Sequence, residues 1–279
     1  MKLAILHPGD MGVTVAVAMA ASGHEVYWLP EGRSSATVAR ARGAAFQSCG
    51  SLAELVATVH GIVSVCPPHG AVGLARSVMS AGFAGTYVDA NAVSPETARE
   101  IESILGAGFV DGGIIGPPAL KQGNTRLYLS GEQSDAVAQW FSGGLLEAKV
   151  IPGPAGAASA LKMCYAAYTK GSSAMLLAVR ALAEAEGVAA ALTDEWDISQ
   201  QGLAHRSELA ALGSATKAWR FVGEMQEIAR TFRGVGLPGE FHDGAAEIFR
   251  RMDSLKEHEH VTFDDVLALL NSKTHTNSD

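Results

Sequence analysis

The stretch Lys2-Leu3-Ala4-Ile5-Leu6-His7-Pro8-Gly9-Asp10-Met11-Gly12 decides the fold of this chain. Its apolar first part predicts a buried strand, and a turn that contains two glycines follows at once. The dinucleotide-binding fingerprint is G-x-G-x-x-G, in which the second glycine lets the backbone approach a pyrophosphate and the third lets the helix pack against the strand. Gly9 and Gly12 stand at these two positions, whereas His7 replaces the first glycine.

An ordinary turn between a strand and a helix is the alternative interpretation of this segment. The turn follows a strand, opens a small-residue helix and precedes a second expected strand at residues 25–29, which together favour the fingerprint. The phosphates of a dinucleotide would then meet the N–H groups of the helix N-terminus. We expect cofactor contacts from His7, Pro8, Gly9, Asp10, Met11 and Gly12.

The first half of the chain alternates short apolar runs with helical patterns. This alternation predicts a Rossmann-like domain with a mostly parallel, doubly wound sheet that is covered on both faces by helices. Strands are expected at residues 3–6, 25–29, 45–46, 62–65, 86–89, 109–111, 126–129 and 149–151. Helices are expected at residues 11–22, 34–42, from 51 onward and at 94–105.

The second half contains only helical patterns. A long helix at residues 155–187 is followed by expected helices at 194–203, 217–232, 239–251 and 262–270. The predicted fold class is therefore α/β plus all-α, with an NAD(P)-binding domain at 1–152 and an all-helical substrate and dimerisation domain at 153–279. The active cleft is expected between the two domains, at the carboxyl ends of the strands.

Composition excludes several classes of partner. The formal net charge of −8 and the lack of a basic run argue against nucleic acid and against an anionic membrane. No apolar stretch is long enough to span a membrane. The three cysteines lie far apart and form no CxxC pair, so we expect no metal site and a cytoplasmic protein.

The segment after the second expected strand decides the choice of nicotinamide cofactor. Glu31 would bind the ribose hydroxyls of NAD, whereas Arg33 with Ser34 would bind the additional phosphate of NADP. We expect NADP, with NAD possible. Further cofactor contacts are expected where two other strands end, from Cys66, Pro67, Pro68 and Asn91.

Three further segments resemble the β-hydroxyacid dehydrogenase superfamily, which includes 6-phosphogluconate and 3-hydroxyisobutyrate dehydrogenases. They are Val88-Asp89-Ala90-Asn91 with Pro95, Val110-Asp111-Gly112-Gly113-Ile114-Ile115-Gly116, and Gly153-Pro154-Ala155-Gly156 followed by Lys162. The resemblance implies that Lys162 is catalytic and that the substrate contacts Gly112, Gly113, Ile114, Ile115 and Gly116. It also implies a homodimer that pairs through the helical half. The second half looks similar to an incompletely characterised branch whose members bind NADP.

The chain departs from this superfamily at Ala166, where the pattern has an asparagine four residues after the lysine. Thr169 and Lys170 share roughly the helix face of Lys162 and could supply the missing polar contacts, with Tyr165 beside them. A lysine exchanges protons near neutral pH where burial or neighbouring cations lower its pKa. The small apolar residues around Lys162, and the charge of Lys170, favour this role over that of a surface lysine.

The sequence thus predicts NADP-dependent hydride transfer between the nicotinamide and a small hydroxy acid or oxo acid, with Lys162 as general acid and base. An imine reductase on the same fold is one alternative, although such relatives generally lack the lysine. The other alternative is a non-catalytic NADP-binding sensor or interaction protein, which the absent asparagine and the altered glycine turn would suit.

Overall fold

The structure is a computed structural model that describes residues 1–258 and 260–272. The chain forms two compact units, Met1–Tyr165 and Ala166–Asp279. The last residues of the predicted helical domain, 273–279, lie outside the described residues.

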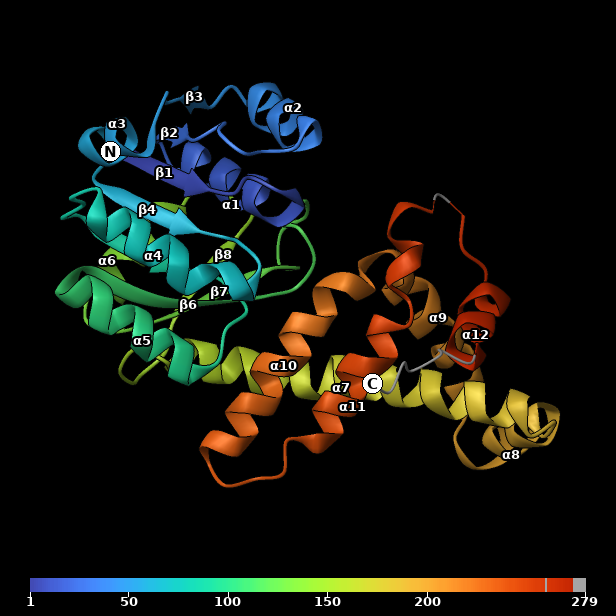
Figure 1. The fold of residues 1–279 in the computed structure, drawn as a ribbon. Helices are drawn as coiled ribbons and strands as arrows, with labels where there is room; N and C mark the ends of the chain where they lie inside the picture. The colour runs from blue at the N-terminus through green and yellow to red at the C-terminus, as the bar shows by residue number, and fades with distance from the viewer. Residues whose placement is uncertain (259, 273–279) are drawn as a thin grey trace, which may run out of the picture. The chain divides into compact units, whose positions relative to one another are not determined.

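An eight-stranded sheet is the centre of the first unit (Figure 1). The strand order is β3-β2-β1-β4-β5-β6-β7-β8, and every neighbouring pair is parallel except β6 with β7. The strands are β1 (Lys2–Leu6), β2 (Glu25–Trp28), β3 (Gln47–Ser48), β4 (Gly61–Ser64), β5 (Thr86–Asp89), β6 (Phe109–Ile115), β7 (Arg126–Ser130) and β8 (Glu147–Val150). The predicted α/β class with a doubly wound sheet is confirmed.

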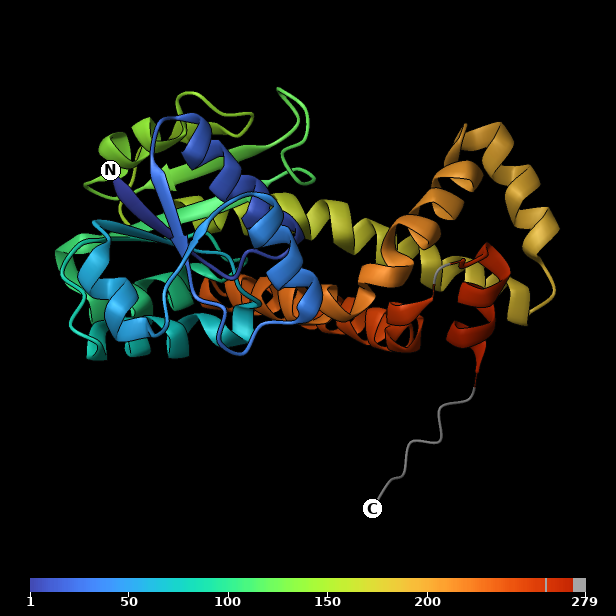
Figure 2. The same ribbon diagram turned by 90° about the horizontal axis from the view of Figure 1, so that it is seen from above.

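Helices cover both faces of this sheet (Figure 2). They are α1 (Asp10–Ala21), α2 (Ser35–Gly43), α3 (Leu52–Thr58), α4 (Ala71–Ser80), α5 (Pro95–Leu105) and α6 (Ser134–Ala138), with 3-10 turns η1 (Pro68–Gly70), η2 (Gly106–Gly108) and η3 (Gln139–Phe141). Side chains alternate between the two faces along a strand. In β1, Leu3 and Ile5 therefore join one buried core, while Ala4 and Leu6 join the other.

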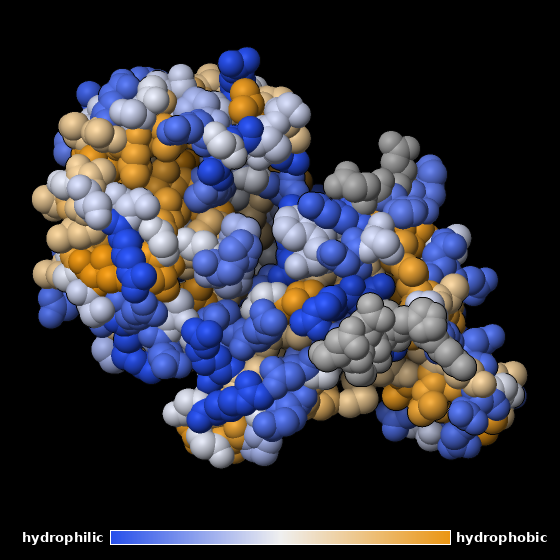
Figure 3. Space-filling view, viewed as in Figure 1, coloured by the Kyte–Doolittle hydropathy of each residue, from blue (hydrophilic) through white to orange (hydrophobic). Residues whose placement is uncertain are grey.

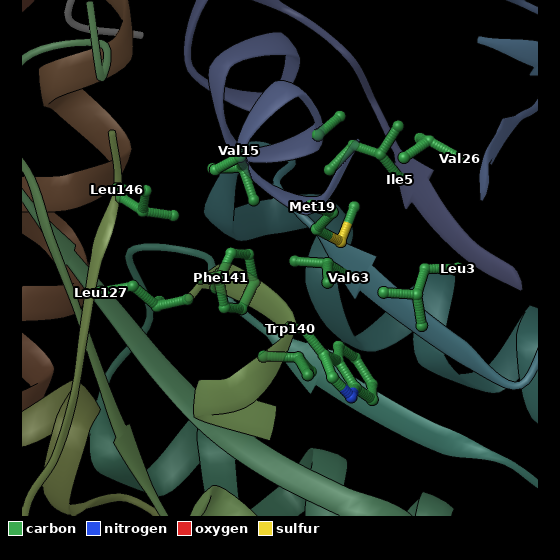
Figure 4. Close-up of a cluster of buried hydrophobic side chains, with 14 of the residues drawn as sticks. Leu3, Ile5, Val15, Met19, Val26, Val63, Leu127, Trp140, Phe141 and Leu146 are labelled. Atoms are coloured by element: carbon green, nitrogen blue, oxygen red, sulfur yellow. The ribbon is translucent and has the colours of Figure 1, made fainter. Parts of the chain in front are cut away.

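The core on the α1 face is drawn in Figure 4. Met19 of α1 packs with strand residues such as Ile5 and Val63, and Trp140 and Phe141 of η3 close the cluster. All five side chains are at most 5% exposed. Burial of apolar surface of this extent holds the helices on the sheet and so fixes where each strand end lies.

The second unit is helical. It contains α7 (Ala157–Ala185) from residue 166 onward, α8 (Ala189–Ser199), α9 (Leu203–Ser214), η4 (Ala215–Lys217), α10 (Ala218–Gly234), α11 (Glu240–Arg250), η5 (Asp253–Glu257) and α12 (Phe263–Asn271). Helices α10 and α11 lie side by side (Figures 1 and 2), with the rings of Phe221 and Phe249 edge to face at 5.2 Å. The predicted long helix and helical second half are confirmed.

Several predicted elements need correction. The third strand lies at residues 47–48 instead of 45–46, because Ala45 adopts φ +57, a left-handed conformation that ends strand geometry. The predicted helix at 194–203 ends at Ser199, and Gly202, with φ +76, precedes a separate α9. Helix α4, which follows Pro67 and Pro68, was not predicted from the sequence at all.

Candidate functional site

The order of the strands reverses between β1 and β4, and this reversal locates the candidate site. In open α/β sheets, ligands bind outside the carboxyl ends of the strands at such a point. Leu6 and Ser64 end the two strands in register, and the N–H of Val65 donates to the carbonyl oxygen of Leu6 at 3.0 Å. His7 and Cys66 follow these strand ends.

His7 makes the turn after β1 in a left-handed conformation, with φ +73. Glycine reaches this region freely, whereas a residue with a Cβ pays roughly 1–2 kcal/mol. The N–H of Gly9 donates to the carbonyl oxygen of His7 at 2.8 Å and closes the turn. The Nδ1 atom of His7 is buried and has no hydrogen-bond partner among the residues that the structure describes. The histidine that stands in place of the first glycine thus leaves an unpaired ring nitrogen at the point where the strand order reverses.

Gly9 and Gly12, the two glycines of the turn, differ in whether the fold leaves room for a side chain. A Cβ on Gly12 would lie 2.3 Å from the carbonyl oxygen of His7, so the close contact between turn and helix excludes a side chain. A Cβ on Gly9 would meet no described atom within 4 Å, and φ of Gly9 is an ordinary −69. The fold itself therefore does not require glycine at position 9, whereas an approaching ligand would.

The N-terminus of α1 faces this open space beside Gly9. Within the described part of the chain, no side chain caps the helix, whose first N–H groups lack partners inside the helix. The Asp10 carboxylate in the first turn lies 2.5 Å from the Arg40 guanidinium of α2, which offsets its charge. Pro8 is buried and Met11 is half-buried. An unpaired imidazole nitrogen, an open glycine and an uncapped helix start fit a bound diphosphate.

The loop after β2 contains the residues expected to select the cofactor. Glu31 is exposed, and its carbonyl oxygen accepts a hydrogen bond from Nε of Arg33 at 3.1 Å. Ser34 caps α2, because its hydroxyl accepts from the N–H of Thr37 at 3.3 Å. The Ser34 hydroxyl is therefore partly engaged before any phosphate is bound.

Cys66 lies two residues beyond the end of β4. Burial raises the pKa of the Cys66 thiol to about 12, and the charge of Asp89 adds to this effect. The positive charge of Arg33 lowers the pKa of this thiol. The guanidinium of Arg33 is therefore close enough to the end of β4 to act on it electrostatically. The neighbouring Pro67 is exposed, whereas Pro68 is half-buried and begins η1.

The side chain of Asn91 is engaged with protein atoms. Its Oδ1 accepts from the N–H of Cys66 at 2.5 Å, and its Nδ2 donates to Asp89 at 2.7 Å and to Ser64 at 3.1 Å. Both amide hydrogens are therefore used, and Asn91 is only 2% exposed. The amide thus ties the end of β4 to the end of β5, while its contact with the cofactor stays a prediction.

Asp89 belongs to this hydrogen-bond network and is fully buried. Its Oδ1 also accepts from the backbone N–H of Asn91 at 3.0 Å. Desolvation raises the pKa of Asp89 to about 7, and the charge of Asp111 adds to the rise. Asp89 and Asp111 are register partners on β5 and β6.

Asp111 holds the start of α7. Its Oδ2 accepts from the N–H groups of Gly156 and Ser159 at 2.9 and 3.0 Å, and its Oδ1 accepts from the Ser159 hydroxyl at 2.6 Å. A further bond comes from the hydroxyl of Ser130 on β7 at 3.0 Å. The resemblance implied that the segment beginning at Asp111 lines the substrate site, but sequence reasoning did not predict that this carboxylate holds α7, although an acidic residue inside an apolar strand was a usable signal.

The glycines of β6 allow close packing. A Cβ on Gly112 would lie 2.9 Å from the carbonyl oxygen of Asp89, and a Cβ on Gly113 would lie 2.6 Å from that of Ala158 and 3.0 Å from Cβ of Lys162. The side chains of Ile114 and Ile115 are at most 6% exposed, and Gly116 turns the chain with φ +123. The side chains of these residues therefore pack inside the protein. Only their backbone atoms could contact a substrate.

Lys162 lies on α7 with its Cβ beside Gly113, and the residue is half-buried. It belongs to the first unit, with the glycine turn, the loop after β2 and the ends of β4 and β5. Tyr165, one turn further along, is 48% exposed. The structure thus places the predicted lysine and the predicted phosphate turn in one compact unit.

The predicted substrate residues Thr169 and Lys170 belong to the second unit. Thr169 is half-buried. Lys170 forms an ion pair with Glu224, and its ammonium lies 4.3 Å from the centre of the Phe221 ring. Glu224 therefore offsets the charge of Lys170, and the predicted effect of that charge on Lys162 stays a prediction.

Within the described residues, no group of three or more histidine, cysteine or acidic side chains could hold a metal ion. A search of the same residues finds no helix that is long and apolar enough to cross a membrane. Hydrophilic side chains and smaller hydrophobic patches alternate over the surface in Figure 3.

Comparisons with known proteins agree with this fold. The family described as Domain of unknown function (DUF1932) matches residues 183–252. A conserved protein of unknown function, whose structure is described as similar to 3-hydroxyacid dehydrogenases, is 26% identical with a TM-score of 0.67. That match covers 92% of this chain and 98% of the other. Curated protein sequences give no match.

Two further solved structures share the fold. The 3-hydroxyisobutyrate dehydrogenase of Mycobacterium tuberculosis, solved with L-serine, is 19% identical; the match covers 97% of this chain and 99% of that chain, with a TM-score of 0.67. A reductive aminase from Aspergillus terreus, in complex with NADPH and ethyl levulinate, is 18% identical; the match covers 97% and 98%, with a TM-score of 0.57.

The architecture defined here is that of the 3-hydroxyacid dehydrogenases, an oxidoreductase fold. The family model and these solved structures support a relationship of the chain to the β-hydroxyacid dehydrogenase superfamily.

Proposed function

We propose that the chain is an NADP-dependent oxidoreductase that interconverts a small hydroxy acid and its oxo acid, with Lys162 as general acid and base. The observation that carries the proposal is the position of Lys162 beside Gly113, in the same compact unit as the open glycine turn. The similarity in fold to hydroxyacid dehydrogenases supports it.

The cofactor would be held at the carboxyl ends of the strands. The turn from His7 to Gly12 would hold the diphosphate, because its N–H groups and the positive end of α1 favour a negative charge. Arg33 would bind the additional phosphate of NADP, with Ser34 beside it. Glu31 is the residue that would hold the ribose of NAD instead. Cys66, Pro67 and Pro68 would border the adenosine side.

When bound, the nicotinamide supplies or accepts the hydride, and the protein manages the proton. In the direction of reduction, the ammonium of Lys162 would donate a proton to the developing alkoxide. In the direction of oxidation, its neutral amine would accept the hydroxyl proton as the hydride leaves. The position of Lys162 next to β6 and its half-buried state support this role.

The substrate would contact the backbone of β6, from Gly112 to Gly116, and the exposed ring of Tyr165. Thr169 would supply a hydroxyl. Lys170 is a weaker candidate for binding the substrate carboxylate, because its ammonium is already paired with Glu224.

Imine reduction is the second candidate function, and the similarity to a reductive aminase that binds NADPH favours it. NADPH oxidation by the purified protein, measured over a panel of oxo acids, semialdehydes and imines, separates the candidates. Turnover of oxo compounds supports the main proposal, and turnover of imines alone replaces it with imine reduction. Tight NADPH binding without any turnover would favour a non-catalytic sensor.

We propose a homodimer as the assembly. Tyr168, Met175 and Leu182 follow one another at seven-residue spacing on α7 and are 75%, 45% and 62% exposed. Apolar side chains in such a row commonly mark a contact surface. A monomeric mass in sedimentation equilibrium at micromolar concentration would contradict the assembly.

The free thiols of the three cysteines support a reducing compartment such as the cytoplasm.

A further inference from the structure

Asp111 is a buried carboxylate whose partners lie mainly on the segment that begins α7. The residue is fully buried, and it accepts four hydrogen bonds, three of them from Gly156 and Ser159. An isolated buried carboxylate is strongly unfavourable, whereas one that accepts this many bonds is compensated. The arrangement therefore holds only while β6 and the start of α7 keep their present spacing.

The backbone of this segment is shaped around the carboxylate. Gly156 adopts φ +97, which a residue with a side chain rarely reaches, and this conformation presents its N–H to Asp111. Helix α7 begins at the next residue, Ala157. A negative charge at a helix N-terminus is also favoured by the helix dipole. Asp111 thus fixes both the position and the first turn of α7.

Lys162 depends on this anchor through the geometry of the helix. Ala158 and Lys162 are four residues apart and share one face of α7. Both lie close to Gly113, at the place that a Cβ of this residue would occupy. The N–H of Ala158 donates to the hydroxyl of Ser130, which itself donates to Asp111. A shift of the first turn would therefore move Lys162 along β6.

We propose that Asp111 is a positioning residue for Lys162: it fastens the start of α7 to β6 and so determines where the lysine meets the substrate. This inference rests on the proposed function, because it concerns the lysine of that reaction. It adds a residue that has no contact with the reacting atoms and acts only through α7.

The Asp111→Asn variant tests this role with little change in volume. An amide offers one acceptor oxygen where the carboxylate offers two, and its NH₂ group would face N–H and O–H donors. We expect kcat to fall roughly 10- to 100-fold, because small misplacement of a catalytic group has effects of this size. The alkaline limb of the pH profile of kcat should also shift, since the lysine changes its surroundings. The Kd of NADPH should stay within about twofold of the wild-type value.

Ser94→Ala is the matched control. It removes the buried hydroxyl that caps α5 in the same unit, where it accepts from the N–H of Thr97 at 3.1 Å. This change weakens a helix start but keeps all four hydrogen bonds of Asp111, so the pH profile should keep its wild-type shape. If Asp111→Asn changes kcat and the pH profile no more than Ser94→Ala does, Asp111 is merely structural and the inference is overturned.

Amide hydrogen exchange provides a readout that does not depend on activity. Exchange in Asp111→Asn should increase at residues 157–163 and remain at wild-type rates in α5. Lys162→Ala separates the two proposals: retained turnover in that variant contradicts the proposed function, while the exchange result still reports on the anchor.

If Asp111→Asn does not fold, Ser159→Ala replaces it. That variant keeps the carboxylate and loses only the 2.6 Å bond from the hydroxyl. A smaller fall in kcat with the same shift of the alkaline limb supports the inference, and an unchanged limb overturns it.

Discussion

A Cβ on Gly12 would lie 2.3 Å from the carbonyl oxygen of His7, closer than any real side chain approaches a backbone atom. The hydrogen bond from the N–H of Gly9 to the carbonyl oxygen of His7 holds the turn in this place, so the Gly12→Ala variant should be destabilised. We expect a loss of about 1–3 kcal/mol, the range that is typical of overpacking. Urea unfolding of the purified variant measures it.

Gly43→Ala is the control for this substitution. Gly43 ends α2, and an added Cβ there would meet none of the atoms that the structure describes within 4 Å. A Gly12→Ala protein that is as stable as Gly43→Ala would show that the contact between turn and helix is looser than the structure has it.

Gly9→Ala separates folding from cofactor binding. The position has room for a Cβ and needs no positive φ, so the variant should remain folded. A methyl group beside the uncapped start of α1 would obstruct a diphosphate, so NADPH affinity should fall at least tenfold, about 1.4 kcal/mol. Fluorescence titration with NADPH measures this, again with Gly43→Ala as the control. Unchanged affinity would remove the glycine turn from the cofactor site.

Much of this site follows from local sequence patterns. The strand before His7, the helix after it and the glycines between them are neighbours in the chain, so their spacing alone predicts the turn. The same holds for the long helix that carries Lys162. Contacts between distant segments could not be predicted in this way. The bonds of Asp111 to Gly156 and Ser159 join residues 45 and 48 positions apart, and the partner of Lys170 lies 54 positions away.

Asn91 shows a second limit of sequence reasoning. An asparagine at a strand end suits either a ligand contact or an internal turn, and the pattern does not distinguish them. The structure shows the internal role, because both amide hydrogens of Asn91 bind Ser64 and Asp89. The displaced third strand has a similar origin, since nothing in the sequence marks the left-handed conformation of Ala45.

Arg33→Ala tests the choice between NADP and NAD. The guanidinium would pair with the additional phosphate of NADP, and hydrogen bonds to charged groups contribute about 1.5–3 kcal/mol. NADPH affinity should therefore fall roughly 10- to 100-fold, whereas NADH affinity should change little. Calorimetric titration of both cofactors measures the two effects. The result that contradicts the assignment is NADPH binding at the wild-type affinity.

Asp89 should make stability depend on pH. Its pKa in the folded protein is raised to about 7, so the folded state keeps the proton over a range where the unfolded chain, with an ordinary carboxyl, has lost it. The resulting stabilisation is fully present below about pH 4 and is lost as pH rises through about 7. Over this range the wild type should therefore lose stability relative to Asp89→Asn.

Urea unfolding at several pH values between 4.5 and 8 measures this difference. Asp135→Asn, which alters an exposed carboxyl on α6, serves as the control and should follow the wild type. A constant difference between wild type and Asp89→Asn across the range would mean that Asp89 is ionised throughout.

Turnover by Lys162→Ala tests the central claim most directly. The substrate is the compound of the oxo-acid and imine panel that the wild type reduces fastest, and NADPH binding is measured on the same preparation. Removal of a general acid should lower kcat about 100-fold or more and leave NADPH affinity near the wild-type value, because the cofactor residues lie elsewhere in the unit. Turnover at the wild-type rate with intact NADPH binding would contradict the account.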